Sequence, residues 1–589
     1  MAIDQSARAS VLGVATEYRD LRAANAATLP MRIALFGQGA TASTFSTTKR
    51  VAGTAYEAGS RYGFGSPIHL AMLELRPASG DGVGSIPIDI YPMEDADGAS
   101  AATGAVVPSG TASANSTYYA RIGGILSPGF TIVASTLTGS ALSNALRALG
   151  DAVAAEPNMP VTVGWTYGEI TQAFSGTGNG VLSALSASGE PEPGDWLLVC
   201  TAAATDAGTF SLTDPNGTVV STTIVASAGG SSFDVSGLAG TLTDGTTDFA
   251  AGDTFTITVP ATQADFVTKW KGASANGCEI EIVDELGDLT FTITQPTGGA
   301  TNPTLDASLA QVGTTVWTTL GLNCLNVSDT TALGTLATWN EGRWLETVNR
   351  PMVCFVGNTT ADRASACTVS SARTTDRTNS QLVAPGSLDL PFRVAARQLA
   401  RIAKQANDDP ANEAQGQIAS GINPGLDSEQ WDYTARDAAV KDGSSTIIVE
   451  DGVVKIEDVI TFYAPSGDPL PPYRWVSDIL KIMNCNYNVE LRFKSSKWKG
   501  KALVPNDQVV TNPRVRKPMD AIGDLQQIVK GLSQDGLLAD PESIYATIGA
   551  ELNSQNNRRL DTEVTWIISG CAGIISHTSY FGFYFPASA

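Results

Sequence analysis

Catalytic chemistry would have to rest on very few residues, because the 589-residue chain contains only two histidines, His69 and His577. A hydrolase of the Ser-His-Asp type needs a histidine as its general base. No Gly-x-Ser-x-Gly nucleophile elbow accompanies either histidine. We therefore expect no enzyme and no catalytic residue. A hydrolase that depends on His69 or His577 stays as a minor alternative.

Metal, nucleotide and cofactor sites also lack their usual patterns. The turn Gly37-Gln38-Gly39 follows the apolar run 31–36, but it has no third glycine, and the chain has no Gly-Lys-Ser/Thr motif. Acidic residues are not spaced as in a calcium loop. Seven cysteines are scattered without a Cys-x-x-Cys pair, which favours free thiols in a reducing compartment: Cys200, Cys278, Cys324, Cys354, Cys367, Cys485 and Cys571. We expect no cofactor and no metal.

One charged segment stands out, and it is basic. Only one acidic residue, Asp507, lies between residues 492 and 517. The segment is either a solvated surface or a patch that docks an acidic protein partner, with Trp498 as an aromatic anchor. Its basic residues are Arg492, Lys494, Lys497, Lys499, Lys501, Arg514, Arg516 and Lys517.

The charge of the whole chain limits the possible partners. The net charge is −22, although only 16% of the residues are charged. An acidic surface disfavours nucleic acid and anionic membranes. No run approaches eighteen apolar residues, and the first ten residues do not resemble a secretory signal. We expect no nucleic-acid partner, no membrane insertion, and synthesis and assembly in a cytoplasm.

Strand-like and helix-like runs alternate over two parts of the chain, 26–100 and 266–435, which predicts an α/β core in two pieces. Strand candidates include 31–36, 86–93 and 351–356, and helices are expected around 52–75 and over 391–406. We therefore predict an α/β and α+β multidomain protein.

Two β-rich insertions are expected between these pieces, over 101–171 and 172–265. No Lys or Arg occurs between Arg147 and Lys269, whereas thirteen acidic residues do. Asp214-Pro-Asn-Gly217 between two β-like runs predicts a hairpin. The second insertion is interpreted as an additional all-β surface module.

A C-terminal α+β domain is predicted over 436–575, with a hairpin at Asp451-Gly452 and two amphipathic helices. Residues 1–25 and 576–589 are interpreted as extended arms. An aromatic strand at the end of the chain either joins its own sheet or pairs with a neighbouring subunit. The candidate linking residues are Val11, Val14 and Tyr18 in the N-terminal arm and Tyr580, Phe581, Phe583 and Phe585 in the C-terminal strand.

The order of several loose motifs resembles the contractile tail sheath proteins of myophages, in particular the Mu-type branch. The motifs span most of the chain, and the module at 172–265 is the largest departure from the family. They are SVLGVATEYRDLRA…LPMRIALFGQGA (10–40), TQPTGGATNP (294–303), STIIVEDGVVKIEDVITFY (445–463), the helix 473–492 and NRRLDTEVTW (557–566).

The resemblance implies a subunit that stacks as hexameric rings around a tail tube and contracts to drive the tube through the host envelope. It implies a non-catalytic, subtilisin-like core, and arms that complete sheets in neighbouring copies. It also implies a tail tube partner, baseplate and tail terminator proteins, a location in the virion tail, and a basic patch that faces the tube. The alternative is another virion or surface protein whose β-module binds a cell-surface glycan.

Overall fold

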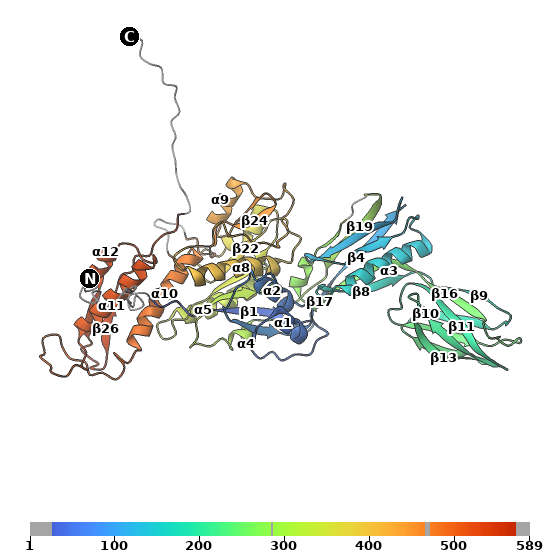
Figure 1. The fold of residues 1–589 in the computed structure, drawn as a ribbon, viewed down its shortest axis with the longest axis horizontal. Helices are drawn as coiled ribbons and strands as arrows, with labels where there is room; N and C mark the ends of the chain where they lie inside the picture. Colours follow the sequence, from blue (N-terminus) through green and yellow to red (C-terminus); the bar gives the residue numbers. More distant parts are fainter. Residues whose placement is uncertain (1–25, 284–286, 466–471, 573–589) are drawn as a thin grey trace, which may run out of the picture. The chain divides into compact units, whose positions relative to one another are not determined.

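The computed structural model describes residues 26–283, 287–465 and 472–572, which form two compact units. Of the described residues, 31–283, 287–404 and 415–465 belong to the larger unit, and 26–30, 405–414 and 472–572 belong to the smaller unit. Figure 1 shows a mixed architecture of separate sheets and helices along the chain. The prediction of a mixed α/β multidomain protein is confirmed. The predicted boundary at residue 436 differs from this division, since residues 415–468 pack with the larger unit.

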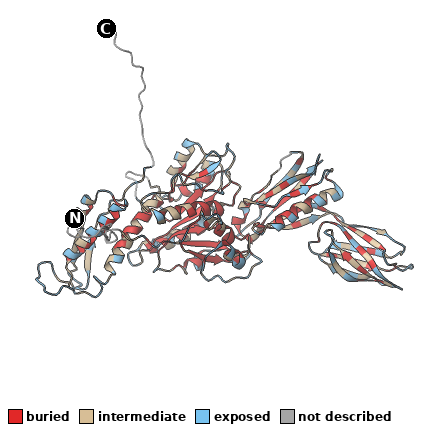
Figure 2. Cartoon of the chain, viewed as in Figure 1, coloured by how far each residue is buried: buried red, intermediate tan, exposed pale blue. Residues whose placement is uncertain are grey.

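A six-stranded sheet forms the core of the larger unit, in the order β2-β3-β1-β20-β21-β22. All neighbouring strands in it are parallel except the edge pair β2–β3. Parallel strands are covered on both faces and read as continuous apolar runs, and Figure 2 shows this burial. The strands are β1 (Arg32–Gln38), β2 (Arg50–Ala52), β3 (Ile88–Met93), β20 (Thr318–Asn323), β21 (Val353–Asn358) and β22 (Asn379–Val383).

Helices pack on this sheet through small apolar clusters. Leu336 of α5 packs in one cluster with Phe36 of β1, and Leu333 packs with Val356 of β21. The expected single helix after Ala52 is two helices separated by a turn at residues 63–66. The helices are α1 (Ala55–Tyr62), α2 (Pro67–Leu75), α4 (Asp306–Leu309), α5 (Thr330–Trp344), α6 (Arg363–Ala366), α7 (Thr368–Ser371), α8 (Pro391–Asp408) and α9 (Tyr433–Lys441).

Three arginines at helical spacing fix α8 within the larger unit. Arg393 forms an ion pair with Glu74 (Nη2–Oε1 2.5 Å), and Arg397 forms one with Asp81 (Nη2–Oδ2 2.5 Å). Arg401, one turn further on, also pairs with Asp81. Spacing of four residues places all three side chains on one face, so this face of α8 is bound to Glu74 of α2 and to Asp81.

A second sheet, β19-β4-β17-β8, is covered by α3 and combines distant parts of the sequence. Its strand β17 pairs with β4 on one side and with β8 on the other. Strands predicted on either side of residue 265 therefore share one sheet, while the domain boundaries at 171 and 265 stay predictions. The elements are β4 (Ala101–Gly110), α3 (Gly139–Ala155), β8 (Val161–Tyr167), β17 (Ala261–Lys271) and β19 (Leu289–Thr297).

A small sheet accompanies it, in which β5 pairs with β6, β7 and β18. A short 3-10 helix, η3 (Ala273–Gly277), follows β17. The strands are β5 (Ser116–Ile122), β6 (Ile125–Leu126), β7 (Phe130–Ile132) and β18 (Ile280–Val283).

The acidic β-module is an eight-stranded sheet, antiparallel except for a short parallel contact between β13 and β15, and its own core includes Trp196, Phe210, Phe249 and Phe255. The hairpin predicted at Asp214 is confirmed: it joins β12 and β13, and the Gly217 amide donates to the Asp214 carbonyl at 3.0 Å. The strands are β9 (Thr171–Ser175), β10 (Val181–Ala187), β11 (Gly194–Ala204), β12 (Ala207–Thr213), β13 (Val219–Ser227), β14 (Ser231–Val235), β15 (Leu238–Thr243) and β16 (Thr254–Val259).

The hairpin predicted at Asp451-Gly452 is also confirmed, between β23 (Ile447–Glu450) and β24 (Val453–Ile456) in the larger unit. Both turn residues have positive φ, 52° and 73°. Those values match the type I′ turn that suits a two-residue hairpin and favours Asp-Gly.

The smaller unit is built on helices and one hairpin. Cys485 of α10 packs with Leu525 and Val529 of α11, and Trp566 packs against this cluster. None of the described helices is long and apolar enough to cross a membrane. The elements are α10 (Val476–Phe493), α11 (Pro518–Gln534), α12 (Pro541–Thr547), β25 (Gly549–Leu552) and β26 (Leu560–Glu563).

Candidate functional site

His69 is a buried residue whose contacts stabilise the fold. It lies in α2 with 1% of its surface exposed, and its Nδ1 accepts a hydrogen bond from the Gly65 amide at 3.0 Å. Burial lowers the pKa of His69 to about 4, so the ring is neutral at neutral pH. It closes the turn between α1 and α2. His577 lies outside the described residues.

The described residues contain no group of three or more His, Cys, Asp or Glu side chains that could hold a metal ion. None of the seven cysteines, all within the described ranges, forms a disulfide, and six are buried. Gly39 in the glycine-containing turn has a packing reason, because a Cβ there would lie 2.2 Å from the Phe45 ring. The turn is therefore explained by close packing.

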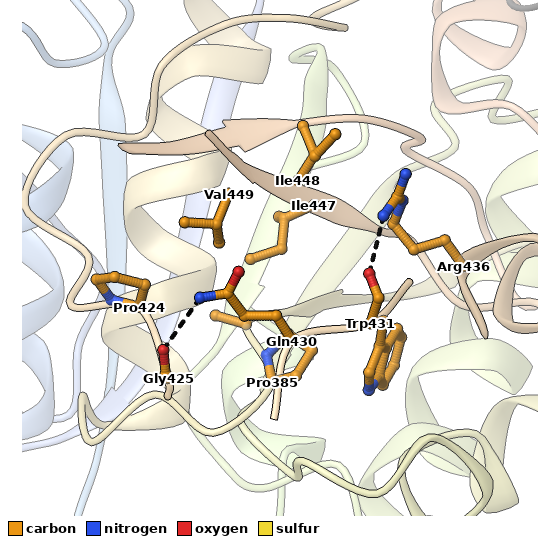
Figure 3. Close-up of a pocket in the computed structure, with 10 residues that line it drawn as sticks. Pro385, Pro424, Gly425, Gln430, Trp431, Arg436, Ile447, Ile448 and Val449 are labelled. Atoms are coloured by element: carbon orange, nitrogen blue, oxygen red, sulfur yellow. Dashed lines mark hydrogen bonds between the residues drawn. The ribbon is translucent and has the colours of Figure 1, made fainter. Parts of the chain in front are cut away.

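One small cavity lies in the larger unit between β23 and the 424–431 loop (Figure 3). Its volume is about 60 Å³, whereas small-molecule sites usually have about 300–1,000 Å³. Two of its polar side chains form hydrogen bonds with backbone carbonyls that also line the cavity. Gln430 Nε2 donates to the Gly425 carbonyl, and Arg436 Nη1 donates to the Trp431 carbonyl. The cavity has room for water and for no cofactor.

A buried carboxylate organises the predicted basic segment. Asp524 of α11 is 1% exposed, and its Oδ1 accepts from Arg492 Nη1 at 3.0 Å and Lys497 Nζ at 2.6 Å. Its Oδ2 accepts from Trp498 Nε1 at 2.7 Å. Asp524 lies seven residues beyond the segment, so the sequence alone did not show that it neutralises part of the patch. Arg492 and Lys497 hold the fold of the smaller unit together.

Three further basic side chains are also engaged within this unit. Lys494 pairs with Glu490, and Arg516 Nε donates to the Lys497 carbonyl at 2.9 Å. Lys517 Nζ donates to the carbonyls of Asn506 and Gln508. These bonds shape the loop that follows α10.

Lys499, Lys501 and Arg514 are the members of the patch whose side chains form no hydrogen bond or ion pair with another described residue, although their backbone amides are bonded. Lys499 and Arg514 are exposed, and Lys501 is partly exposed. They are the cations that a partner can use without breaking an existing bond.

A groove beside these cations runs between residues 493–503 and the hairpin strand β26. Its volume is about 820 Å³. One wall carries the Phe493 and Trp498 rings, whose centroids are 5.1 Å apart, and Lys501 and Arg558 supply positive charge. An aromatic wall between cations suits an acidic protein segment.

The predicted linking residues of both arms lie outside the described residues: Val11, Val14, Tyr18, Tyr580, Phe581, Phe583 and Phe585. The structure does describe the chain next to each arm. Residues 26–29 and 569–571 both contact polar side chains of α10. Sequence reasoning considered only the apolar face of this helix and missed these side chains.

The geometry is that of a mixed α/β multidomain protein. Such a chain is similar to the contractile tail sheath proteins of phages, and the resemblance predicted from its motifs is confirmed. No model of a protein family matches the chain.

The curated relative is a Mu-like prophage FluMu tail sheath protein of Haemophilus influenzae, 24% identical over 319 residues. The match covers 53% of this chain and 62% of the relative, so it spans less than two thirds of the relative's length.

Two solved structures are also similar. A sheath tail protein of Listeria innocua is 10% identical, with a TM-score of 0.39 over 92% of this chain and 96% of that one. A sheath tail protein of Desulfitobacterium hafniense is 9% identical, with a TM-score of 0.39 over 95% and 100%. At these low TM-scores the likenesses assign no domain, contact or activity.

Proposed function

We propose that the protein is the structural subunit of a contractile phage tail sheath. In this proposal it polymerises as stacked hexameric rings around a tail tube and contracts to drive the tube through the host envelope. The observation that carries the proposal is the 319-residue similarity to a tail sheath protein. The role is mechanical, without a catalysed reaction or a cofactor.

Links between copies come from the arms in this proposal. Residues 1–25 and 576–589 add strands to sheets of neighbouring subunits, with Phe581, Phe583 and Phe585 as the apolar face of the C-terminal link. Burial of each phenylalanine contributes about 1.5–3 kcal/mol, and each backbone hydrogen bond contributes about 1 kcal/mol net. Such a link survives rotation of the subunits during contraction.

The tube docks on the basic patch in this proposal. Lys499, Lys501 and Arg514 are available for an acidic surface, and the groove beside Trp498 adds apolar area. The charge distribution supports this assignment: residues 472–572 contain thirteen Lys or Arg and eleven Asp or Glu, in a chain of net charge −22. Baseplate and tail terminator proteins are the proposed partners at the two ends, in a virion tail assembled in the host cytoplasm.

Electron microscopy of the purified full-length protein tests this function. We expect hollow tubes of uniform width, because every subunit would carry the same links. Deletion of residues 579–589 should leave soluble monomers with the circular dichroism spectrum of the intact chain. Tubes formed by the truncated protein would contradict the strand-donation proposal, and absence of any polymer from the intact protein and its tube partner would contradict the sheath assignment.

A further inference from the structure

One face of α10 carries three buried polar side chains that the apolar packing of the helix does not require. Lys481, Asn484 and Asn488 are spaced by three and four residues, which places them in one row. Their exposed fractions are 0%, 3% and 7%. Burying such groups costs free energy unless each finds hydrogen-bond partners, so their partners show what the row does.

The two asparagines hold the chain that follows the N-terminal arm. Asn488 Oδ1 accepts from the Ala27 amide at 2.8 Å, and its Nδ2 donates to the Ala27 carbonyl at 3.0 Å. Asn484 Oδ1 accepts from the Leu29 amide at 3.3 Å. Asn488 thus offers Ala27 a donor and an acceptor, as a neighbouring β-strand does. Because these bonds go to the backbone, they fix the path of the chain whatever side chains it carries.

The asparagines are themselves held in orientation by their own helix. Asn484 Nδ2 donates to the Leu480 carbonyl at 3.0 Å, and Asn488 Nδ2 also donates to the Asn484 carbonyl at 2.9 Å. A side chain fixed in this way loses little further freedom when it binds the passing chain. The row is therefore preorganised.

The lysine holds the chain that leads to the C-terminal arm. Lys481 Nζ donates to the Ser569 carbonyl at 2.6 Å and lies 3.5 Å from Cys571 Sγ and 3.7 Å from Asp478 Oδ1. Ser569 is also fixed from its other side, since its amide donates to the Leu537 carbonyl at 3.1 Å. A fully buried ammonium is costly when an apolar side chain could fill the space, which points to a role for this bond.

We propose that the Lys481–Asn484–Asn488 row of α10 is a common anchor that fixes where both arms leave the folded subunit. This proposal rests on the proposed sheath function, in which the arms link neighbouring copies. Both points at which the arms leave the subunit are held by α10. The row therefore sets the distance between the link made by the N-terminal arm and the link made by the C-terminal arm. These are positioning residues, because their bonds within the described chain go to groups of this chain, chiefly backbone amides and carbonyls.

The test compares Asn484→Leu/Asn488→Leu with the intact protein, because leucine keeps the branching of asparagine at Cγ and removes the hydrogen bonds. Hydrogen exchange should accelerate about tenfold or more at the amides of residues 27 and 29. Amides of α11 should exchange as before, which shows that the unit is folded. The yield of uniform tubes should fall about tenfold, since the arm no longer leaves at a fixed point.

Asn412→Leu is the matched control, because Asn412 is exposed in the same unit and its side chain donates a hydrogen bond to the nearby Asp409 carboxylate. Lys481→Met makes the same test on the chain that leads to the C-terminal arm, and we expect faster hydrogen exchange at the amides of residues 569 and 571. If the double variant loses protection from exchange in α11, the unit has unfolded, and Asn488→Asp replaces it as the test variant. An ionised carboxylate accepts a hydrogen bond from the Ala27 amide but cannot donate one to the Ala27 carbonyl.

Unchanged exchange at residues 27 and 29 would overturn the anchor, and so would faster exchange combined with tubes of normal repeat and yield. Failure of the intact protein to form tubes would count against the sheath function instead. The exchange result would then still decide whether the row holds the two exits.

Discussion

Glu192 and Asp151 form a close pair of carboxyl groups where the β-module joins the rest of the larger unit. Burial, together with the charge of Asp151, raises the pKa of Glu192 to about 7, while Arg147 opposes the shift. Burial also raises the pKa of Asp151. The nearby Arg147 Nη1 reaches the Pro193 carbonyl at 3.5 Å. A carboxyl group whose pKa is raised in this way makes the junction sensitive to pH.

Glu192→Gln should therefore remove a pH dependence of stability. The pKa of Glu192 is above the 4.5 of an ordinary glutamate, so between pH 4.5 and 7 the folded state binds more protons than the unfolded state. The free energy of unfolding of the intact protein then falls as the pH rises through this window. Thermal unfolding from pH 4.5 to 8 should show this slope in the intact chain and a flatter profile in the variant.

Asp195→Asn is the control for this measurement, since Asp195 is an exposed acid on the neighbouring strand β11. It should keep the slope of the intact protein. A slope in Glu192→Gln equal to that of the intact protein would show that the pair does not control the junction.

At the scale of elements, the β-module is inserted between two strands that are already hairpin partners. Tyr167 at the end of β8 lies opposite Ala261 at the start of β17 in an antiparallel pair. The chain leaves the sheet at one of these residues and returns at the other. The module has its own core, against which Tyr167 of β8 packs, so each part keeps most of its hydrophobic packing without the other.

Replacement of residues 168–260 by Asn-Gly should therefore leave the remaining protein folded. A two-residue type I′ turn closes antiparallel strands whose ends are paired in this way. The lost contacts are few: the bond from the Tyr167 hydroxyl to the Pro191 carbonyl at 2.8 Å, the contact of Arg147 with the Pro193 carbonyl, and the Glu192–Asp151 carboxyl pair. We expect the free energy of unfolding to fall by only about 1–2 kcal/mol, measured by denaturant titration.

The isolated segment 169–260 provides the complementary measurement, and it should unfold cooperatively by itself. Aggregation of the shortened chain, with a folded isolated module, would show that the module protects a surface of its host sheet.

Elements set by local chemistry were predictable from the sequence, and those set by distant pairing were not. Asp451-Gly452 specifies its hairpin through two positive φ values, and Asp214–Gly217 specifies another. By contrast, β17 joins β4 across more than 150 residues, and no local pattern encodes that partner. The helix expected after Ala52 was wrong as one element, because Gly63, with a φ of 92°, ends α1.

At the scale of the whole molecule, the basic patch is smaller than its sequence implies. Asp524 and Glu490 neutralise several of its members, and the pairs with Asp524 could be assigned only once α10 and α11 were placed side by side. The sequence shows which basic residues are close together in the chain, whereas the structure shows which of their side chains remain available for a partner. The arm residues remain predictions.

Lys499→Glu/Lys501→Glu tests whether the remaining cations dock the tube. Lys497 is left in place because it pairs with buried Asp524, and its reversal would destabilise the unit. We expect binding to the tail tube protein to weaken about tenfold at low ionic strength, and the difference to shrink as salt is added. Co-sedimentation with preformed tubes measures this.

Lys530→Glu is the control for that variant, since Lys530 is an exposed lysine on α11 outside the patch. The thermal stability of both variants should equal that of the intact protein. Equal sedimentation of the two variants would assign the tube contact to another surface.

The shared exits on α10 also determine how a pull on the subunit would travel. Lys481 and Asn488 are seven residues apart, which is about 10 Å along a helix. In the proposed sheath, a force that enters through one arm and leaves through the other crosses only this short length of α10. The six-stranded sheet and the β-module then carry no tension, although they contain most of the chain. A large domain can therefore be inserted in the part of the subunit that carries no tension without weakening the connection between one subunit and the next.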